Sequence, residues 1–222
     1  MNWKDIPIHI IDFEGNGRTG VVEFGVAILE GGEVVSGLTS YCRAQGSIPR
    51  REMELHGLTN KDVANADPLS VHWDFFNELR QAGPLGAHHA SVEDNLLKKT
   101  WSHPRMAPDF SRPGEQLAEW GPWVDTRELY SSLFPSVSSC GLGKLVHQFE
   151  LLPQVDELAG RFCPPARRQF HAALYDAIAS AVLLLNLSKY SELEECLTLP
   201  WLLAQSQSDP GKKQSIQQIK MF

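Results

Sequence analysis

The sequence predicts an α/β protein in which helices flank a five-stranded mixed β-sheet. Two patterns predict this class: three β-rich segments open the chain, and helical segments then alternate with short strand candidates. The chain has 222 residues, 42% hydrophobic and 21% charged, which suits one sizeable core. We expect a single domain over residues 1–204, followed by a flexible tail over residues 205–222.

The first three strands form a meander. Residues 6–13 are almost continuously apolar and β-branched, which is typical of a strand buried on both faces. Residues 21–29 and 33–41 are also β-rich, and the two glycines between them supply the positive φ angles of a tight hairpin turn. Two shorter strand candidates lie at residues 84–87 and 122–124.

Apolar spacing and segment length predict the helices, which we expect at residues 68–79, 91–101, 140–149, 171–187 and 191–204. The helix at 171–187 is the most apolar and hence the most buried of these. A loop rich in Pro and Gly covers residues 102–121, and Thr126 is the expected N-cap of one further helix. Residues 205–213 have the composition of a flexible linker.

Composition excludes several classes of protein. The formal net charge of −7 and the pI near 5.6 do not suit a protein that coats nucleic acid with a broad basic surface. No apolar run reaches the length of about 18 residues that a membrane span needs. The four cysteines are far apart, with no zinc-ribbon spacing, and residues 1–5 do not resemble a secretory signal, so we expect a cytoplasmic location.

Asp12 and Glu14 form the first candidate site. They lie two residues apart at the end of the first strand, so both carboxylates leave the same face, about 7 Å apart at the backbone. Burial and mutual repulsion make two ionised carboxylates costly there unless a cation compensates them. Their hard oxygen atoms favour Mg²⁺ or Mn²⁺ over zinc.

Two further clusters of polar residues follow. Asp176 lies within the apolar helix at 171–187, where a carboxylate is costly without a partner, and His171 at the start of this helix is suited to act as a base. Residues 88–94 run from the fourth strand into a helix and supply a further carboxylate. Adjacent His88 and His89 point in different directions and lack a third soft ligand, so we do not expect zinc.

Taken in order, these three clusters resemble the exonuclease motifs of the DEDDh (DnaQ-like) 3′–5′ exonuclease superfamily, which includes the proofreading epsilon subunit of bacterial DNA polymerase III. They read Asp12-Phe13-Glu14, His88-His89-Ala90-Ser91-Val92-Glu93 and His171-Ala172-Ala173-Leu174-Tyr175-Asp176. Supporting segments in the family's order lie at residues 55–59, 66–68, 124–126 and 142–145. The resemblance covers residues 6–187 and implies a ribonuclease-H-like fold.

The chain departs from the family pattern at three points. The middle motif of the family reads H-N-A-x-F-D, which places Glu93 at its acidic position, with Asp94 as the alternative one residue later. His89 replaces the usual Asn of that motif. Residues 15–17, Gly-Asn-Gly, replace the usual Thr-Thr-Gly after the first motif. The acidic positions and the histidine are all filled, which favours an active enzyme over a decayed copy.

The resemblance implies two-metal-ion hydrolysis of a terminal phosphodiester, with two Mg²⁺ or Mn²⁺ ions. Asp12, Glu14 and Asp176 are the expected metal ligands, Glu93 is expected to act through a water molecule, and His171 is the expected general base. The expected substrate is single-stranded DNA or a frayed 3′ end, with nucleoside 5′-monophosphates as products. The residues expected to contact the substrate are Phe13, Gly15, His56, His88 and His89.

Two alternatives stay open on the sequence alone. One is an exoribonuclease similar to ribonuclease T, because the same catalytic set hydrolyses RNA and DNA. The other is a catalytically idle module that binds nucleic acid in the same groove. The C-terminal residues Gln218, Ile219, Lys220, Met221 and Phe222 also resemble a sliding-clamp-binding peptide, which would tether the protein at DNA ends.

Overall fold

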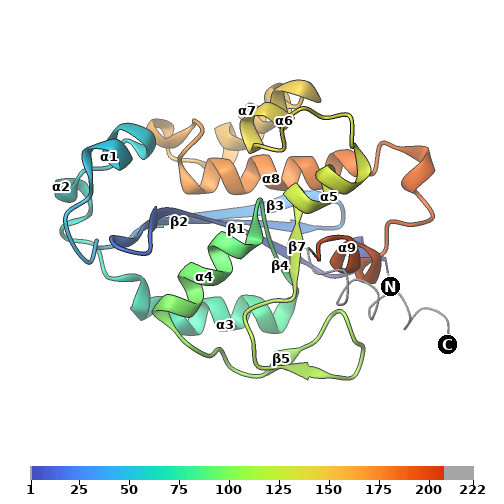
Figure 1. Cartoon of the computed structure of the whole chain (residues 1–222), viewed down its shortest axis with the longest axis horizontal. Helices are drawn as coiled ribbons and strands as arrows, with labels where there is room; N and C mark the ends of the chain where they lie inside the picture. The colour runs from blue at the N-terminus through green and yellow to red at the C-terminus, as the bar shows by residue number, and fades with distance from the viewer. Residues whose placement is uncertain (1, 208–222) are drawn as a thin grey trace.

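The computed structural model describes residues 2–207 and contains a five-stranded sheet in the order β3-β2-β1-β4-β7 (Figure 1). Strands β1 (Ile8–Asn16), β2 (Gly20–Glu30) and β3 (Glu33–Tyr41) form an antiparallel meander. The short strands β4 (Leu85–Ala87) and β7 (Trp123–Asp125) continue the sheet parallel to β1. The predicted five-stranded mixed sheet is therefore confirmed.

Helices cover both faces of this sheet (Figure 1). On one face lies α8 (Ala173–Leu187), with α5 (Thr126–Leu133), α6 (Leu142–Gln148) and α7 (Leu152–Phe162) packed around it. On the other face lie α3 (Trp73–Ala82) and α4 (Ala90–Thr100). The shorter helices are α1 (Arg50–His56), α2 (Asn60–Val63) and α9 (Leu199–Gln205).

Strand β1 lies between two hydrophobic clusters because its side chains alternate between the faces. Ile8 and Ile10 belong to the cluster under α8, whereas Ile11 and Phe13 belong to the cluster under α3 and α4. All four are buried, so the prediction of a strand covered on both faces is confirmed.

A glycine in β2 allows α8 to start directly on the sheet. A Cβ atom at Gly25 would lie 2.2 Å from the backbone nitrogen of Leu174, so any larger residue would push the first turn of α8 away. Gly25 is the register partner of Asp12 on β1. The start of α8 is therefore fixed beside the carboxyl end of β1.

Several predicted element bounds are wrong. The helix predicted at residues 171–187 starts at Ala173, because His171 adopts a left-handed backbone with a φ of 63°. The helix predicted at 191–204 is instead a 3₁₀ turn at Ser191–Leu193 and then α9, which starts with Leu199-Pro200. Similarly, residues 68–79 divide into a 3₁₀ turn at Leu69–His72 and α3.

Three further details differ from the prediction. Thr126 is the first residue of α5 rather than its N-cap; the cap is Asp125, whose side chain accepts hydrogen bonds from the backbone nitrogens of Arg127 and Glu128. The loop predicted at 102–121 contains a two-stranded ladder, β5 (Ala107–Pro108) with β6 (Gln116–Leu117). The sequence pattern does not locate helices α1, α2 and α7.

The predicted linker is wrong at its first two residues. Gln205 is the last residue of α9, and Ser206 is buried, where its hydroxyl accepts a hydrogen bond of 2.8 Å from the backbone nitrogen of Asp125. The clamp-binding peptide predicted at residues 218–222 lies outside the described residues. Among residues 2–207, no helix has the length and apolar character to cross a membrane.

Candidate active site

Four carboxylates converge at the carboxyl end of β1. Asp12 and Glu14 come from β1, Glu93 from the first turn of α4, and Asp176 from the first turn of α8. Glu14, Glu93 and Asp176 are buried, with 7%, 4% and 7% of their surface exposed. Ligand atoms of Glu14, His171 and Asp176 all lie within 4.8 Å of one another. Carboxylates from β1, α4 and α8 therefore lie together at the end of β1.

A glycine closes the turn that follows the two β1 carboxylates. The β1–β2 register shifts between Glu14 and Gly15, and Gly15 adopts a φ of 119°. A Cβ atom there would lie 2.2 Å from the carbonyl oxygen of Gly20, so a larger residue would displace the turn. Gly15 therefore permits the β-bulge that directly follows Glu14.

Burial and mutual repulsion disfavour negative charge at this point. Burial, and then repulsion from Asp176, raises the pKa of Glu14 to about 8. Burial raises the pKa of Asp176 to about 7, and burial followed by repulsion from Asp176 and Glu93 raises the pKa of Asp12 well above its usual value. The pKa of Glu93 is also raised, first by burial and then by Glu14. At neutral pH the cluster therefore retains protons unless a cation neutralises it.

The residues present fit a hard divalent cation. Oε2 of Glu93 and Oδ1 of Asp176 are buried and have no hydrogen-bond partner. Buried polar atoms are normally paired, and each unpaired one costs about 1–3 kcal/mol. Unpaired carboxylate oxygens in a cluster of raised pKa values are the donor set that Mg²⁺ and Mn²⁺ prefer. The Mg²⁺ or Mn²⁺ preference expected from the sequence is chemically consistent with this cluster.

Glu93 and Asp94 point to different places, because adjacent helix positions are about 100° apart. Glu93 is directed into the carboxylate cluster, as its unpaired oxygen and its interaction with Glu14 indicate. Asp94 instead lies 2.6 Å from Nζ of Lys98, and its other oxygen accepts a hydrogen bond from Nε1 of Trp123 at 3.3 Å. Of the two alternatives, the geometry brings only Glu93 into the cluster.

His171 lies at the mouth of the cluster with an exposed side chain. Its backbone nitrogen donates a 3.1 Å hydrogen bond to Oδ2 of Asp176. Its backbone carbonyl accepts a 3.1 Å hydrogen bond from Nη2 of Arg167. Partial burial of the ring lowers the pKa of His171, which favours the neutral imidazole at physiological pH.

The three histidines predicted to contact the substrate differ in how many of their ring nitrogens already have a partner inside the protein. Both ring nitrogens of His88 are engaged inside the protein, at 2.9 Å from Oγ1 of Thr126 and 2.8 Å from the carbonyl of Cys140. Nδ1 of His89 lies 3.0 Å from Nη1 of Arg127. His56 is buried, and its Nδ1 accepts from the backbone nitrogen of Leu58, so its unpaired Nε2 carries the proton.

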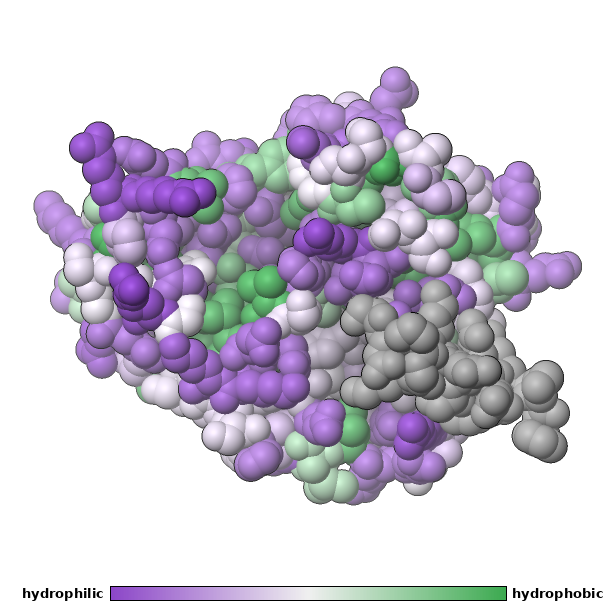
Figure 2. Space-filling model, viewed as in Figure 1, coloured by the Kyte–Doolittle hydropathy of each residue, from purple (hydrophilic) through white to green (hydrophobic). Residues whose placement is uncertain are grey.

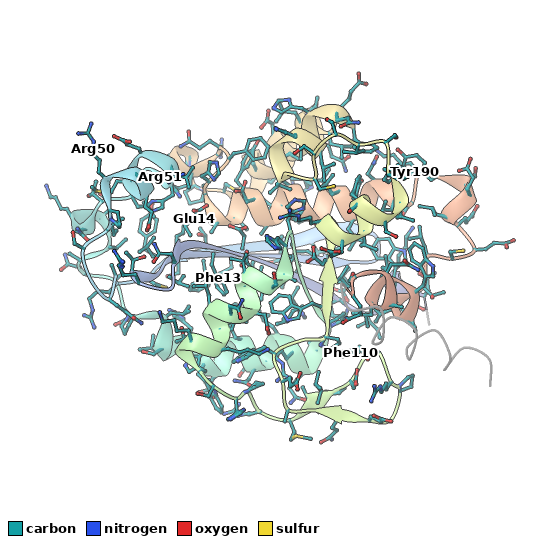
Figure 3. All side chains as sticks on the ribbon, viewed as in Figure 1. Phe13, Glu14, Arg50, Arg51, Phe110 and Tyr190 are labelled. Atoms are coloured by element: carbon teal, nitrogen blue, oxygen red, sulfur yellow. The ribbon has the colours of Figure 1, made fainter. Side chains whose placement is uncertain are left out.

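Phe13 lies between Asp12 and Glu14 on β1, and its side chain points to the face of the sheet that α3 and α4 cover (Figure 3). Its ring packs edge-on against Phe76 at a centroid distance of 5.7 Å. Figure 2 shows hydrophobic surface at the bottom of a hollow between α4 and the segment that carries α1, with hydrophilic residues around it. Such a hollow can accept an apolar ring face with a charged group at its edge.

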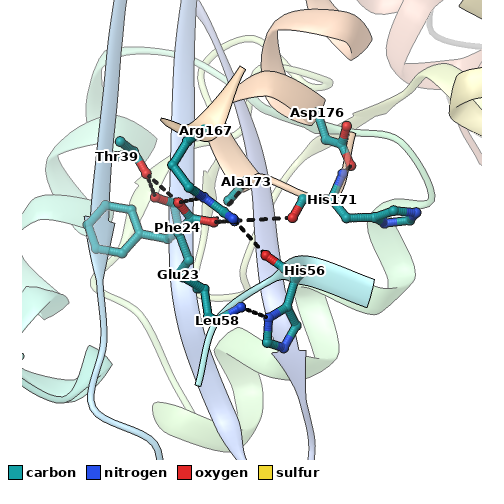
Figure 4. Close-up of polar contacts among 9 residues, drawn as sticks. All are labelled: Glu23, Phe24, Thr39, His56, Leu58, Arg167, His171, Ala173 and Asp176. Carbon is teal, nitrogen blue, oxygen red and sulfur yellow. Dashed lines mark hydrogen bonds and ion pairs between the residues drawn. The ribbon is translucent and has the colours of Figure 1, made fainter. Parts of the chain in front are cut away.

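Three buried charged residues near the cluster have no role in the sequence prediction. Glu23 on β2 and Arg167 form a buried ion pair (Figure 4). Asp125 accepts hydrogen bonds from the backbone nitrogens of His89 and Ala90 at 3.0 and 2.8 Å, which fixes the start of α4. Glu23 could have been found, because a lone acid interrupts the apolar run at residues 21–29, but Arg167 has no such signal.

Comparison of the whole sequence with known proteins gives distant relatives. No protein-family model matches the chain. The chain is 23% identical over 188 residues to the PolC-type DNA polymerase III of Streptococcus sanguinis (strain SK36), which covers 83% of the chain and 11% of that polymerase. For the PolC-type polymerase of Listeria monocytogenes the identity is 24% over 190 residues, covering 84% and 12%. The chain thus spans only about a tenth of the length of these curated relatives.

Comparison with solved structures gives consistent matches over most of the chain. Exonuclease X in complex with 5′ overhanging duplex DNA has a TM-score of 0.59 and 21% identity, covering 83% of this chain and 93% of that one. The nuclease domain of 3′hExo, a DEDDh family member bound to rAMP, has a TM-score of 0.58 and 18% identity, covering 89% and 97%. The expected resemblance in fold is therefore confirmed: this chain has the ribonuclease-H-like fold of the solved DEDDh exonucleases.

Proposed function

We propose that this chain is a metal-dependent 3′–5′ exonuclease. It hydrolyses terminal phosphodiesters of single-stranded DNA or frayed 3′ ends and releases nucleoside 5′-monophosphates. The observation that carries this proposal is the convergence of Asp12, Glu14, Glu93 and Asp176, with two buried oxygens unpaired, beside the exposed His171. The distant relatives support it, because Exonuclease X and Exonuclease I are enzymes solved with DNA.

Asp12, Glu14 and Asp176 would hold two Mg²⁺ or Mn²⁺ ions, and Glu93 would act through a water molecule. When bound, the ions lower the pKa of a bound water and neutralise charge on the scissile phosphate. The fit rests on the oxygen-only donor set and on the raised pKa values of these carboxyl groups. The ions would remove the repulsion that otherwise keeps the carboxyl groups protonated.

His171 would take the proton from the attacking water. Its side chain is exposed next to Glu14 and Asp176, so it can reach a water molecule held at the cluster. The lowered pKa of His171 keeps its imidazole neutral and able to accept a proton near pH 7. The hydrogen bond from its backbone nitrogen to Asp176 ties its position to a proposed metal ligand.

The terminal nucleotide would lie in the hollow beside Phe13 and Gly15. The Nε2–H of His56 is unpaired but buried, and we propose that a substrate oxygen accepts its hydrogen bond when the nucleotide binds. His88 has no free ring nitrogen, so we propose that it supports the start of α4 rather than donating to substrate.

We also propose that residues Gln218, Ile219, Met221 and Phe222, which lie outside the described residues, bind a sliding clamp. We further propose a cytoplasmic location.

RNA is the second candidate substrate. The observation that favours it is the fold similarity to 3′hExo bound to rAMP and to a 3′-exonuclease that recognises a histone mRNA stem-loop. An idle nucleic-acid-binding module is disfavoured, because such a module has no need for a complete set of buried carboxylates.

Hydrolysis of 5′-labelled single-stranded DNA and RNA of equal sequence tests the proposal. The wild type and Asp12→Ala are compared in Mg²⁺, Mn²⁺ or EDTA. We expect a ladder that shortens from the 3′ end, requires metal and is absent in the variant, with DNA degraded faster than RNA. Degradation of RNA at the same or a higher rate than DNA would identify the protein as an exoribonuclease instead. Cleavage of neither DNA nor RNA would overturn the proposal.

A further inference from the structure

A buried ion pair lies next to the candidate active site but contributes no atom to the carboxylate cluster. Glu23 on β2 and Arg167 are both buried, with side chains 1% and 7% exposed. Nε of Arg167 donates to Oε1 of Glu23 at 3.1 Å, and Nη2 donates to the second oxygen. The two groups therefore meet in the bidentate geometry that is specific to arginine and carboxylate.

The same two side chains also hold the backbone of three other segments (Figure 4). Arg167 donates to the carbonyl of His56, at the end of α1, at 2.6 Å and to the carbonyl of His171 at 3.1 Å. Glu23 accepts from the backbone nitrogen of Ala173, the first residue of α8, at 3.1 Å. One ion pair thus connects β2, α1, the His171 loop and α8.

His171 needs such support because its backbone is in an unfavourable conformation. A φ of 63° is uncommon for a residue with a Cβ atom and persists where the surroundings enforce it. Two hydrogen bonds hold the residue there, one from its nitrogen to Asp176 and one to its carbonyl from Arg167. Without the second bond, rotation of the peptide would swing the imidazole away from the cluster.

We propose that Arg167, held in place by Glu23, is a positioning residue that sets the orientation of the His171 imidazole toward Glu14 and Asp176. The inference goes beyond the proposed function but uses its assignment of His171 as the base. Arg167 donates to Glu23 and to the carbonyls of His56 and His171, and to none of the proposed metal ligands Asp12, Glu14 and Asp176, so replacing Arg167 removes no bond to a ligand.

The test is a double-mutant cycle between Arg167→Met and His171→Ala. A positioned general base contributes about 10²–10⁴-fold to turnover, and we expect Arg167→Met to lose much of that factor in kcat, with a smaller change in KM. In the His171→Ala background the same change should have almost no further effect. Mn²⁺ affinity measured by calorimetry should stay within about twofold of wild type, because no ligand is removed.

Two further variants control for misfolding and for a general effect of removing an arginine. Arg167→Met leaves Glu23 buried without a partner, so Glu23→Gln combined with Arg167→Met removes both charges if the single variant does not fold. Arg168→Met is the matched control, because Arg168 is exposed and donates to the carbonyls of Cys163 and Gly160 rather than to His171. Turnover of Arg168→Met should equal that of wild type.

The outcomes separate this inference from the proposed function. Equal losses from Arg167→Met in the wild-type and His171→Ala backgrounds would show an independent role and overturn the inference. Unchanged kcat in Arg167→Met, with kcat lost in His171→Ala, would overturn the inference and leave the proposed function standing. Full activity in His171→Ala would overturn the inference and the assignment of His171 as the base, but it would leave the exonuclease proposal standing, because that proposal is tested by Asp12→Ala.

Discussion

Two regions of this molecule contain buried charged groups, and they differ in whether those groups have hydrogen-bond partners within the protein. Around Arg80, which is 1% exposed, four backbone carbonyls accept hydrogen bonds from one guanidinium: those of Gly121, Arg105, Leu117 and Glu119. Around Asp12 at the end of β1, four carboxylates gather and two of their oxygens have no partner. In the first region the guanidinium has a carbonyl partner for each bond, whereas in the second two buried carboxylate oxygens have no hydrogen-bond partner.

The contrast separates structural charge from functional charge. Burial lowers the pKa of Arg80 to about 10, so the guanidinium remains charged at neutral pH and fixes the loop at residues 102–121. In the carboxylate cluster, burial and repulsion raise the pKa of Glu14 to about 8. A buried charge with all its partners stabilises the fold, and an uncompensated cluster of one sign marks a binding site.

The largest expected effect comes from removing one carboxylate. Asp12→Ala should lower kcat by about 10³-fold or more, because metal-ion catalysis supplies several kcal/mol of transition-state stabilisation. The metal-free variant should unfold at the same or a higher temperature than wild type, because repulsion within the cluster is relieved. Single-turnover kinetics and thermal unfolding in EDTA measure the two effects. A clear loss of thermal stability in Asp12→Ala would contradict this prediction, because it would show that Asp12 stabilises the fold as Arg80 does.

Replacing Arg80 should lower the stability of the fold and leave catalysis unchanged. Arg80→Met leaves buried carbonyls without a donor, and we expect a loss of about 3 kcal/mol in the free energy of unfolding. The kcat of the folded variant should match wild type. Urea unfolding followed by circular dichroism gives the stability.

Arg105→Met is the matched control for this loss. Its side chain is half-exposed and forms an ion pair with Asp74, so its removal should cost no more than about 1 kcal/mol. Equal destabilisation by the two arginine variants would contradict the role assigned to Arg80.

The pH dependence of stability offers a smaller, graded test. The pKa of Glu14 is raised to about 8 and that of Asp176 to about 7, both above their values in an unfolded chain, so the folded state binds more protons between about pH 4 and 8. Stability of the metal-free protein should therefore be highest on the acidic side and fall as pH rises through this window, by up to about 1.4 kcal/mol per pH unit for each group.

Metal should remove this slope, because bound cations favour the ionised carboxylates that acid would protonate. Urea unfolding at several pH values between 5 and 8.5, in EDTA and in saturating Mn²⁺, tests the sign. Glu14→Gln should flatten the slope in EDTA. Stability that rises with pH in EDTA would show that the carboxylates already have partners inside the fold.

The sheet and the pair Asp12 and Glu14 could be predicted from local pattern, whereas Glu93 is placed with them by the family resemblance alone. The run at residues 6–13 is apolar on both faces, and Asp12 and Glu14 end it with polar groups. Element bounds failed where a tertiary contact overrides local preference. Helix α8 starts at Ala173 because Arg167 and Asp176 hold His171 in a left-handed conformation, and neither contact has a sequence signal.

Partnerships across the chain could not be predicted for the same reason. Glu23 and Arg167 are 144 positions apart, and the bond between them depends on how β2 and the loop before α8 meet. Likewise, the sequence pattern predicts that Arg80 is exposed on an amphipathic helix. In the structure, the loop at residues 102–121 covers it and accepts its hydrogen bonds. Periodicity reports which face of an element is apolar, but it does not report which distant segment covers that face.

The smallest expected effect separates Glu93 from Asp94. Glu93→Gln keeps the shape of the side chain but removes a charge from the cluster, so kcat should fall by about 10-fold or more. Asp94→Asn removes only the partner of Lys98, in a partly exposed pair worth at most about 1 kcal/mol, so kcat should change by less than about threefold. Because the two residues are adjacent on α4, the pair of variants controls for any general damage to the helix. The reverse ranking would place Asp94 in the active site and would require α4 to rotate by about 100° from its position in the structure.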